Sequence, residues 1–211
     1  MPRTKKCANC GNPYERLPEH PPFRNWCDSE CAIEIARTRQ DRERKRAIAK
    51  AAAKKKESER RNRAALVELN RSDVKWQKKT TQPVFNRMRV LEELVWFADR
   101  GVEPYCISCR KTHMDWCCGH YKSVGANSKL RYDPINSYLQ CNRNCNMGLS
   151  ANIHGYKEGL IYRFGEEEAA KIEEYCSTNN GVKRWGWEEL EAMRLGFYER
   201  IRKLELYLSN F

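Results

Sequence analysis

The chain has 211 residues, of which 40 are Lys or Arg and 28 are Asp or Glu, and its formal net charge is +12. This length allows one domain with appendages or two small domains, and the charge predicts a polyanionic partner, nucleic acid above all. No run of 18 apolar residues occurs, so we expect no transmembrane helix. No apolar stretch follows the basic start, so we expect no secretory signal and an intracellular, reducing location.

The first segment, residues 1–31, contains Cys7-x2-Cys10 and Cys27-x3-Cys31 around a stretch rich in Pro and turn formers. A segment this short cannot bury a core of its own. Four thiolates around one structural Zn²⁺ would hold it together. Asp28 is a good helix cap before an Ala/Ile/Arg run, and His20, beside two prolines, is expected in an exposed loop.

The second segment, residues 32–70, is a basic arm. Residues 32–66 contain no Gly or Pro, and their 13 Lys/Arg against 5 Asp/Glu give a net charge of +8. This composition predicts a long helix without a sustained apolar stripe. It is either a solvated spacer or an arm that lies along DNA phosphates. In the second case we expect contacts from Arg42, Arg44, Lys45, Arg46, Lys54, Lys55 and Lys56.

The third segment, residues 71–154, opens with a helix over residues 84–101 that stops at Gly101. Cys106-x2-Cys109 and Cys141-x3-Cys145 form a second thiolate quartet. The aromatic stretches WCCGHYKS and NSYLQC predict two strands, and a helix is expected from about Asn142. The pattern predicts a ββα unit stapled by zinc.

A zinc ion with four cysteines has no open coordination position and is expected to be structural. Any chemistry must therefore lie beside it. His120 on the first strand could accept a proton from water. Asn136 precedes the second strand, and Asn146 follows the last cysteine with an amide oxygen that suits Mg²⁺ or Mn²⁺.

The fourth segment, residues 155–211, predicts helices over 166–175 and 187–208. The second helix has an apolar stripe with steps of three and four, made of Leu190, Met193, Phe197, Ile201, Leu204 and Leu208. Such a stripe buries one helix face. It either packs on the same chain or forms the seam of a homodimer.

The third segment resembles the HNH, or ββα-metal, endonucleases of the zinc-stapled kind, and more closely the NinG/Rap recombination proteins of lambdoid phages. The matching pieces are C-I-S-C, Gly119-His120-Tyr121, Q-C, Cys145-Asn146 and S-x-N. The first segment and the charged stretch behind it also fit this family. The implied fold is α+β and mostly helical, with a small N-terminal zinc module of four cysteines, a long basic helix, a treble-clef-like ββα core and C-terminal helices.

The resemblance implies metal-dependent cutting of branched DNA, such as Holliday junctions and D-loops, in the cytoplasm of the host cell. His120 would be the general base, Asn136 would orient it or steady the loop, and Asn146 would bind catalytic Mg²⁺ or Mn²⁺. Further DNA contacts are expected from Tyr121, Lys122, Lys129 and Arg131.

Two features depart from the family pattern. Many relatives place an acidic residue close before the catalytic histidine, whereas Cys117 and Cys118 stand here. The nearest acid, Asp115, would lie ~17 Å from His120 on an extended strand, so it is a weak candidate for a second metal ligand. The second zinc pair is C-x3-C, where the family has C-x2-C. The alternative function is a non-catalytic DNA-binding or adaptor protein with two zinc ions.

Overall fold

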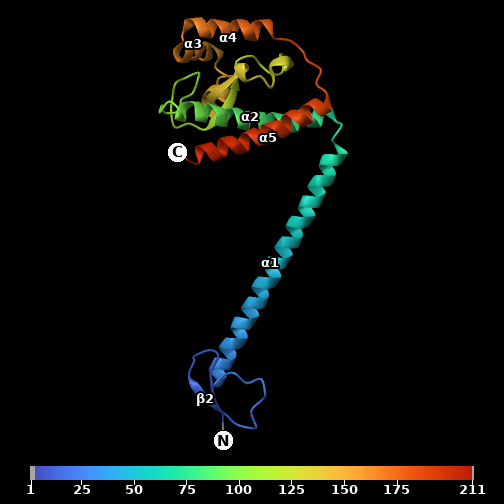
Figure 1. Cartoon of the computed structure of the whole chain (residues 1–211), viewed down its shortest axis with the longest axis vertical. Coiled ribbons are helices and arrows are strands. Elements are labelled where there is room, and N and C mark those ends of the chain that lie inside the picture. The colour runs from blue at the N-terminus through green and yellow to red at the C-terminus, as the bar shows by residue number, and fades with distance from the viewer. Residues whose placement is uncertain (1–2, 211) are drawn as a thin grey trace. The chain divides into compact units, whose positions relative to one another are not determined.

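The computed structural model describes residues 3–210, which form two compact units, one ending at Val67 and the other beginning at Glu68. Helices dominate, and they are accompanied by two small antiparallel sheets of two strands each (Figure 1). This confirms the expected mostly helical α+β class. No helix in the described part of the chain combines the length and hydropathy needed to cross a bilayer.

The first unit is a hairpin followed by one long helix. Strands β1 (Arg3–Lys6) and β2 (Pro13–Arg16) are antiparallel, and α1 runs over Ser29–Leu69. Asp28 starts the helix, because its Oδ1 accepts a hydrogen bond from the backbone of Cys31 at 2.8 Å. Cys31 is the buried residue of α1. The predicted arm is therefore helical and solvated along its length.

The second unit begins with α2 (Val74–Ala98), capped by the Asp73 side chain. The helix starts ten residues before the predicted position and continues through Pro83. It ends before Gly101, whose φ of 60° favours glycine, so the predicted stop is confirmed.

A hairpin of β3 (Trp116–His120) and β4 (Ser137–Cys141) follows, with Trp116 opposite Cys141 and His120 opposite Ser137. Both predicted strands are confirmed. The short 3₁₀ turns η1 (Ser128–Leu130) and η2 (Pro134–Asn136) lie in the connecting loop. The expected third element is a π-helical turn, η3 (Asn142–Gly148), and not an α-helix.

The hairpin lies between two helical layers, with α2 and α5 on one side and α3 and α4 on the other (Figure 1). The bounds of the last three helices are Ile153–Phe164 for α3, Glu166–Thr178 for α4 and Trp187–Leu208 for α5. Helix α3 was not predicted. Gly155 and Gly159 let its backbone approach the Cys106–Cys109 loop, because a Cβ at Gly159 would lie 1.6 Å from the Ile107 carbonyl oxygen.

The apolar stripe of α5 packs on α2 of the same chain. Leu190, Ile201 and Leu204 are buried in one cluster with Val84, Phe85 and Met88, and Met193 and Phe197 pack against it. The stripe therefore closes the core of the second unit, the first of its two expected uses.

A buried charge cluster fastens the hairpin to α2. The Glu93 carboxylate accepts hydrogen bonds from the Leu139 backbone at 3.0 Å, from Arg89 at 3.2 Å and from Arg163 at 2.6 Å. The Arg163 side chain is 1% exposed, and its guanidinium lies 3.8 Å from the centroid of the Trp96 ring. One carboxylate thus joins α2, β4 and α3.

We predict that Glu93→Gln lowers the free energy of unfolding by about 3–5 kcal/mol, because it leaves the buried Arg163 guanidinium without its counter-charge and removes one of the two carboxylates paired with Arg89. Urea unfolding at neutral pH with zinc present measures this. Glu199→Gln removes an exposed carboxylate from the i,i+4 pair with Lys203 and serves as the control. Equal stability of the two variants would contradict the role given to Glu93.

Candidate metal centres and catalytic residues

The second cysteine quartet is assembled at one end of the hairpin. Cys106, Cys109, Cys141 and Cys145 place their sulfur atoms within 4.8 Å of one another. The Cys109 and Cys141 sulfurs are 3.8 Å apart. A tetrahedral zinc with Zn–S bonds of about 2.3 Å separates its sulfurs by about 3.8 Å. The donor set and its spacing therefore fit Zn²⁺.

Several N–H groups point at these sulfurs. The backbone of Cys141 donates to Cys106 Sγ and that of Cys145 to Cys141 Sγ, both at 3.3 Å. The Asn152 amide donates to Cys145 Sγ at 3.5 Å while its Oδ1 caps α3 at Gly155. Hydrogen bonds of this kind orient metal ligands and stabilise thiolates. Asn152 is thus both a cap and a support of the quartet.

The first quartet has the same character. Cys7, Cys10, Cys27 and Cys31 also lie within 4.8 Å of one another, with 3.6 Å between the Cys10 and Cys27 sulfurs. None of the eleven cysteines forms a disulfide. His20 stands outside this set, since its Nδ1 accepts from the Leu17 backbone in a turn. Each quartet can thus hold one zinc ion with no coordination position left for substrate.

His120 ends β3 on the face of the hairpin that packs against α2, and its ring centroid lies 6.1 Å from that of Phe85. Its Nε2 is buried and has no hydrogen-bond partner in the described structure. Burial lowers the pKa of His120 to about 4, helped by the positive charges of Arg131 and Arg89 and opposed by a hydrogen bond with the Arg131 backbone. The ring is therefore neutral at pH 7 and its Nε2 can accept a proton, but it is a weak base for as long as it stays buried.

Asn136 is fully buried, and its amide holds the loop that follows β3. Its Oδ1 accepts from the Lys122 backbone at 2.7 Å, and its Nδ2 donates to the carbonyls of Lys122 and Leu130. Every polar group of this side chain is occupied by the backbone. Of its two expected roles, these contacts fit the one that steadies the loop.

Asn146 belongs to a chain of three polar side chains. Its Nδ2 donates to Asn142 Oδ1 at 3.4 Å, and Asn142 Nδ2 donates to Asp115 Oδ2 at 3.5 Å. The chain uses the amide nitrogen of Asn146 and leaves its Oδ1 without a hydrogen bond in the described structure. This oxygen fits a hard divalent cation such as Mg²⁺ or Mn²⁺. Asn142, which sequence reasoning missed, orients the amide.

Asp115 and His120 lie at opposite ends of β3. The pairing of β3 with β4 is unbroken, so the strand has no bulge that could bring them together. Asp115 instead meets Asn142, whose backbone N–H donates to its carbonyl at 2.8 Å. Within residues 3–210 no hydrogen bond joins His120 to Asn146. The structure therefore groups Asp115 with Asn146 and keeps both apart from His120.

The DNA contacts expected from the hairpin loop are only partly available. Tyr121 is 5% exposed and Arg131 turns inward, donating to Gln82 Oε1 at 3.0 Å and to the Val124 carbonyl. Lys122 is half-buried and Lys129 is exposed. The aromatic rings of this region are core residues and offer no free stacking face. Of these four residues, the two lysines are the better placed to contact DNA.

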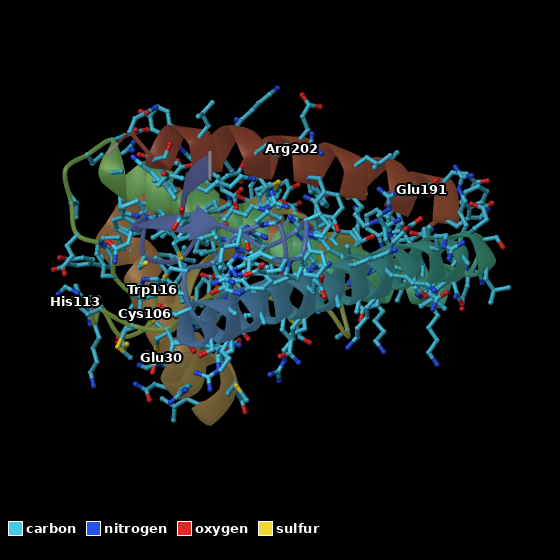
Figure 2. The ribbon with its side chains drawn as sticks, turned by 90° about the horizontal axis from the view of Figure 1, so that it is seen from below. Glu30, Cys106, His113, Trp116, Glu191 and Arg202 are labelled. Atoms are coloured by element: carbon cyan, nitrogen blue, oxygen red, sulfur yellow. The ribbon has the colours of Figure 1, made fainter. Side chains whose placement is uncertain are left out.

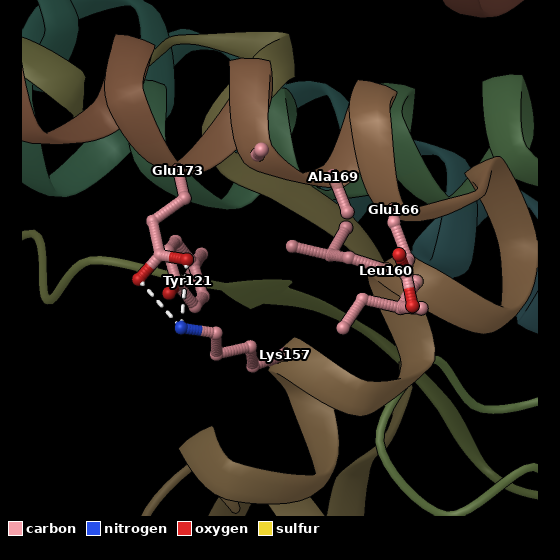
Figure 3. Close-up of a pocket in the computed structure, with 8 residues that line it drawn as sticks. Tyr121, Lys157, Leu160, Glu166, Ala169 and Glu173 are labelled. Carbon is pink, nitrogen blue, oxygen red and sulfur yellow. Dashed lines mark hydrogen bonds and ion pairs between the residues drawn. The ribbon is translucent and has the colours of Figure 1, made fainter.

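A cavity of about 300 Å³ lies beside Tyr121, between α3 and α4 (Figure 3). The Lys157–Glu173 ion pair, 2.8 Å long, closes one side of it. Burial raises the pKa of Tyr121 to about 12, so the hydroxyl stays protonated at neutral pH. The cavity is on the α3 side of the hairpin, whereas His120 faces α2.

We predict that Cys145→Ser lowers the zinc content of the purified chain from two ions to one. Serine is a poor zinc ligand, and the other quartet is unaffected. Elemental analysis after dialysis measures the ratio. The control is Cys117→Ser, which changes a half-buried thiol outside both quartets. A loss of zinc in the control, or a wild type without zinc, would contradict the assignment.

We also predict that the ring of His120 does not titrate between pH 8 and pH 5.5. Burial disfavours the charged ring, so its protonation begins only as the pH falls toward about 4. Proton NMR of the imidazole signals measures this, and the signal lost in His120→Gln gives the assignment. A midpoint near pH ~6.5, the ordinary histidine value, would show that the ring is solvated.

The chain matches one family along most of its length. The profile of the family described as "Bacteriophage Lambda NinG protein" matches residues 1–206. The chain is 32% identical over 200 residues to "Protein ninG" of Escherichia phage lambda, which covers 92% of both chains. It is 31% identical over 200 residues to "Protein ninG" of Salmonella phage P22, again with 92% of both chains covered.

A third relative, "Protein ninG" of Escherichia phage 933W, is 30% identical over 208 residues, covering 96% of this chain and 94% of the relative. No solved structure matches the chain. The match to the family profile spans both cysteine quartets, α1 and the hairpin. On this evidence the chain belongs to the bacteriophage lambda NinG family.

Proposed function

We propose that this NinG-family chain is a metal-dependent endonuclease that cuts branched DNA, with an HNH-like ββα core and His120 as its general base. The observation that carries the proposal is the state of the His120 ring, which is neutral and has an unused Nε2. The ring packs beside Phe85, and a neutral imidazole with one free nitrogen is suited to proton transfer.

In the proposed reaction, His120 Nε2 takes a proton from a water molecule. The water oxygen forms a bond to the scissile phosphorus, and the bond from phosphorus to the 3′ oxygen breaks. The products are a 5′-phosphate and, after protonation of the leaving oxygen, a 3′-hydroxyl. A divalent cation beside this phosphate would stabilise the charge that develops on it. The hairpin keeps Asn146 apart from His120, so Asn146 could hold this cation only after bound DNA had moved the two residues together. Asn142 and Asp115 would hold the Asn146 amide with its oxygen free.

DNA must uncover His120 before it can act. Nε2 has no exposed surface, and the ring is covered on one side by Phe85 of α2. The long loop of residues 121–136, which also carries Arg131, follows His120 directly. Displacement of the part of this loop next to Arg131 by a distorted DNA branch would admit the phosphate, while the hydrogen bonds between Asn136 and Lys122 would keep the start of the loop in place. A need to displace the loop would favour branched DNA over linear DNA. The strands separate at the centre of a branch, whereas the strands of a linear duplex stay paired.

The second candidate is a DNA-binding protein with two structural zinc ions and no catalysis. The covered His120 and the absence of an acid at positions 117 and 118 favour it. This second candidate gives no role to the free Nε2 of His120. The two candidates therefore differ in what removal of the imidazole does to the DNA.

We predict that the purified chain cuts a labelled four-way junction in the presence of Mg²⁺ or Mn²⁺, and that His120→Ala slows cutting by about 10²–10⁴-fold while binding is kept. Single-turnover cleavage and a gel shift on the same samples measure the two properties. His120→Asn repeats the test with a polar side chain in case the alanine variant is unstable.

His154→Ala is the matched control, because His154 is exposed and pairs with Glu158 on the surface of α3. It should cut like the wild type. Two outcomes would contradict the proposed nuclease mechanism and favour the DNA-binding candidate. In one, the wild-type protein leaves the junction intact under all metal conditions. In the other, the wild type and both His120 variants cut equally.

A further inference from the structure

A hollow of about 690 Å³ lies in the first unit, between the four-cysteine module and the first turns of α1. One wall carries the amide side chains of Asn9 and Asn25. The other wall is α1, which contributes Arg39, Arg42 and Arg46 together with a single acid, Glu43. The hollow is thus lined mainly by hydrogen-bond donors and positive charge.

The three arginines form one row. Their spacing of three and four residues places them on the same side of the helix, and the row is about 10 Å long at 1.5 Å per residue. Arg39 is paired with Glu43 at 3.1 Å. Arg42 and Arg46 have no ion-pair partner among residues 3–210, and both are exposed. Two guanidinium groups therefore face the hollow with uncompensated charge.

The opposite wall is fixed by the cysteine quartet. Asn9 Nδ2 donates to Cys31 Sγ at 3.5 Å, and the Asn25 carbonyl accepts from the Ala8 backbone at 2.8 Å. These contacts tie both residues to the metal-binding module. The Asn25 side chain is exposed and makes no hydrogen bond in the described structure, so its amide is available as a donor. The hollow is therefore built on a rigid support.

We propose that this hollow docks the phosphate backbone of DNA and makes the first unit a DNA-binding module in its own right. A guanidinium group matches the geometry of a phosphate and can donate two parallel hydrogen bonds to it. The same side of α1 continues with Lys50 and Lys54 at further steps of four. A row that extends beyond the hollow fits a long polyanion with regularly repeated charges.

An acidic polypeptide fits less well. Protein partners are usually held by apolar or aromatic anchors in desolvated pockets, and the lining offers one large apolar side chain, the half-buried Ile35. A phosphate backbone needs no such anchor. The inference concerns DNA binding by residues 3–67 and does not depend on cleavage by the second unit.

The test compares two double variants of the full-length chain. Arg42→Gln with Arg46→Gln removes the two unpaired charges of the hollow. Arg37→Gln with Arg61→Gln removes the same charge from positions outside the hollow. Helical periodicity places Arg37 on the opposite side of α1, and Arg61 lies about 22 Å beyond Arg46 along the helix at ~1.5 Å per residue. All four residues are exposed. Glutamine keeps helix propensity, and circular dichroism and zinc content verify that the variants are folded.

Fluorescence anisotropy with a labelled linear duplex, over a series of salt concentrations, gives the dissociation constants. For the hollow variant we expect binding about 10- to 100-fold weaker near ~0.1 M salt, and a salt slope smaller by about 1.8, as two lost phosphate contacts require. The control variant should stay within about threefold of the wild type, because neither of its residues lines the hollow.

Equal weakening by both variants would overturn the proposal, since charge along the whole arm would then account for binding. Unchanged binding by the hollow variant would overturn it as well. Poly-L-glutamate is added as a competitor in the same assay. If poly-L-glutamate displaced the labelled duplex as effectively as unlabelled DNA of equal charge, the hollow would be assigned to acidic polypeptides and the proposal would be overturned. Cleavage is not measured, so the outcome is independent of His120.

Discussion

The packing of the hairpin against the helices of the second unit depends on the carboxylate of Glu93. It receives a backbone N–H from β4 and a guanidinium from each of α2 and α3, and the Arg163 side chain above it is enclosed by aromatic rings. Buried charges of this kind are costly unless each has its partner. A hairpin shifted by one residue would leave the carboxylate without its backbone donor. The cluster therefore fixes the position of the hairpin on α2, and with it the place of His120 beside Phe85.

The two ends of the hairpin hold different groups of residues. One end holds the second cysteine quartet, with Trp116 packed against it (Figure 2), and the Asp115–Asn142–Asn146 chain beside it. The other end holds His120 under cover of α2. The π-helical turn after Cys141 accommodates C-x3-C, because a wider turn takes up one extra residue while Cys145 still reaches the quartet. The departure in spacing is thus absorbed locally.

Sequence patterns predicted the elements governed by local chemistry and missed those governed by tertiary contact. The Asp28 cap, the Gly-free arm, the two strands and the α5 stripe carry their signals within a few residues. Helix α3 carries no such local signal. Gly155 and Gly159 lower its helix propensity, and they are explained by the close approach of α3 to Ile107 and Ser108. The start of α2 was obscured by Pro83. The burial of Tyr121, the inward turn of Arg131 and the role of Asn142 depend on residues distant in the chain, which periodicity cannot reveal.

The central claim is that the zinc ions are scaffolding and that a separate divalent cation and the imidazole of His120 act together on one phosphate. A crystal structure of the His120→Ala variant with Mn²⁺ and a four-way junction tests it most directly. The account predicts a manganese anomalous peak apart from both quartets, with a DNA phosphate bound to it and facing residue 120. Bound DNA with metal at the two cysteine quartets alone would contradict the account.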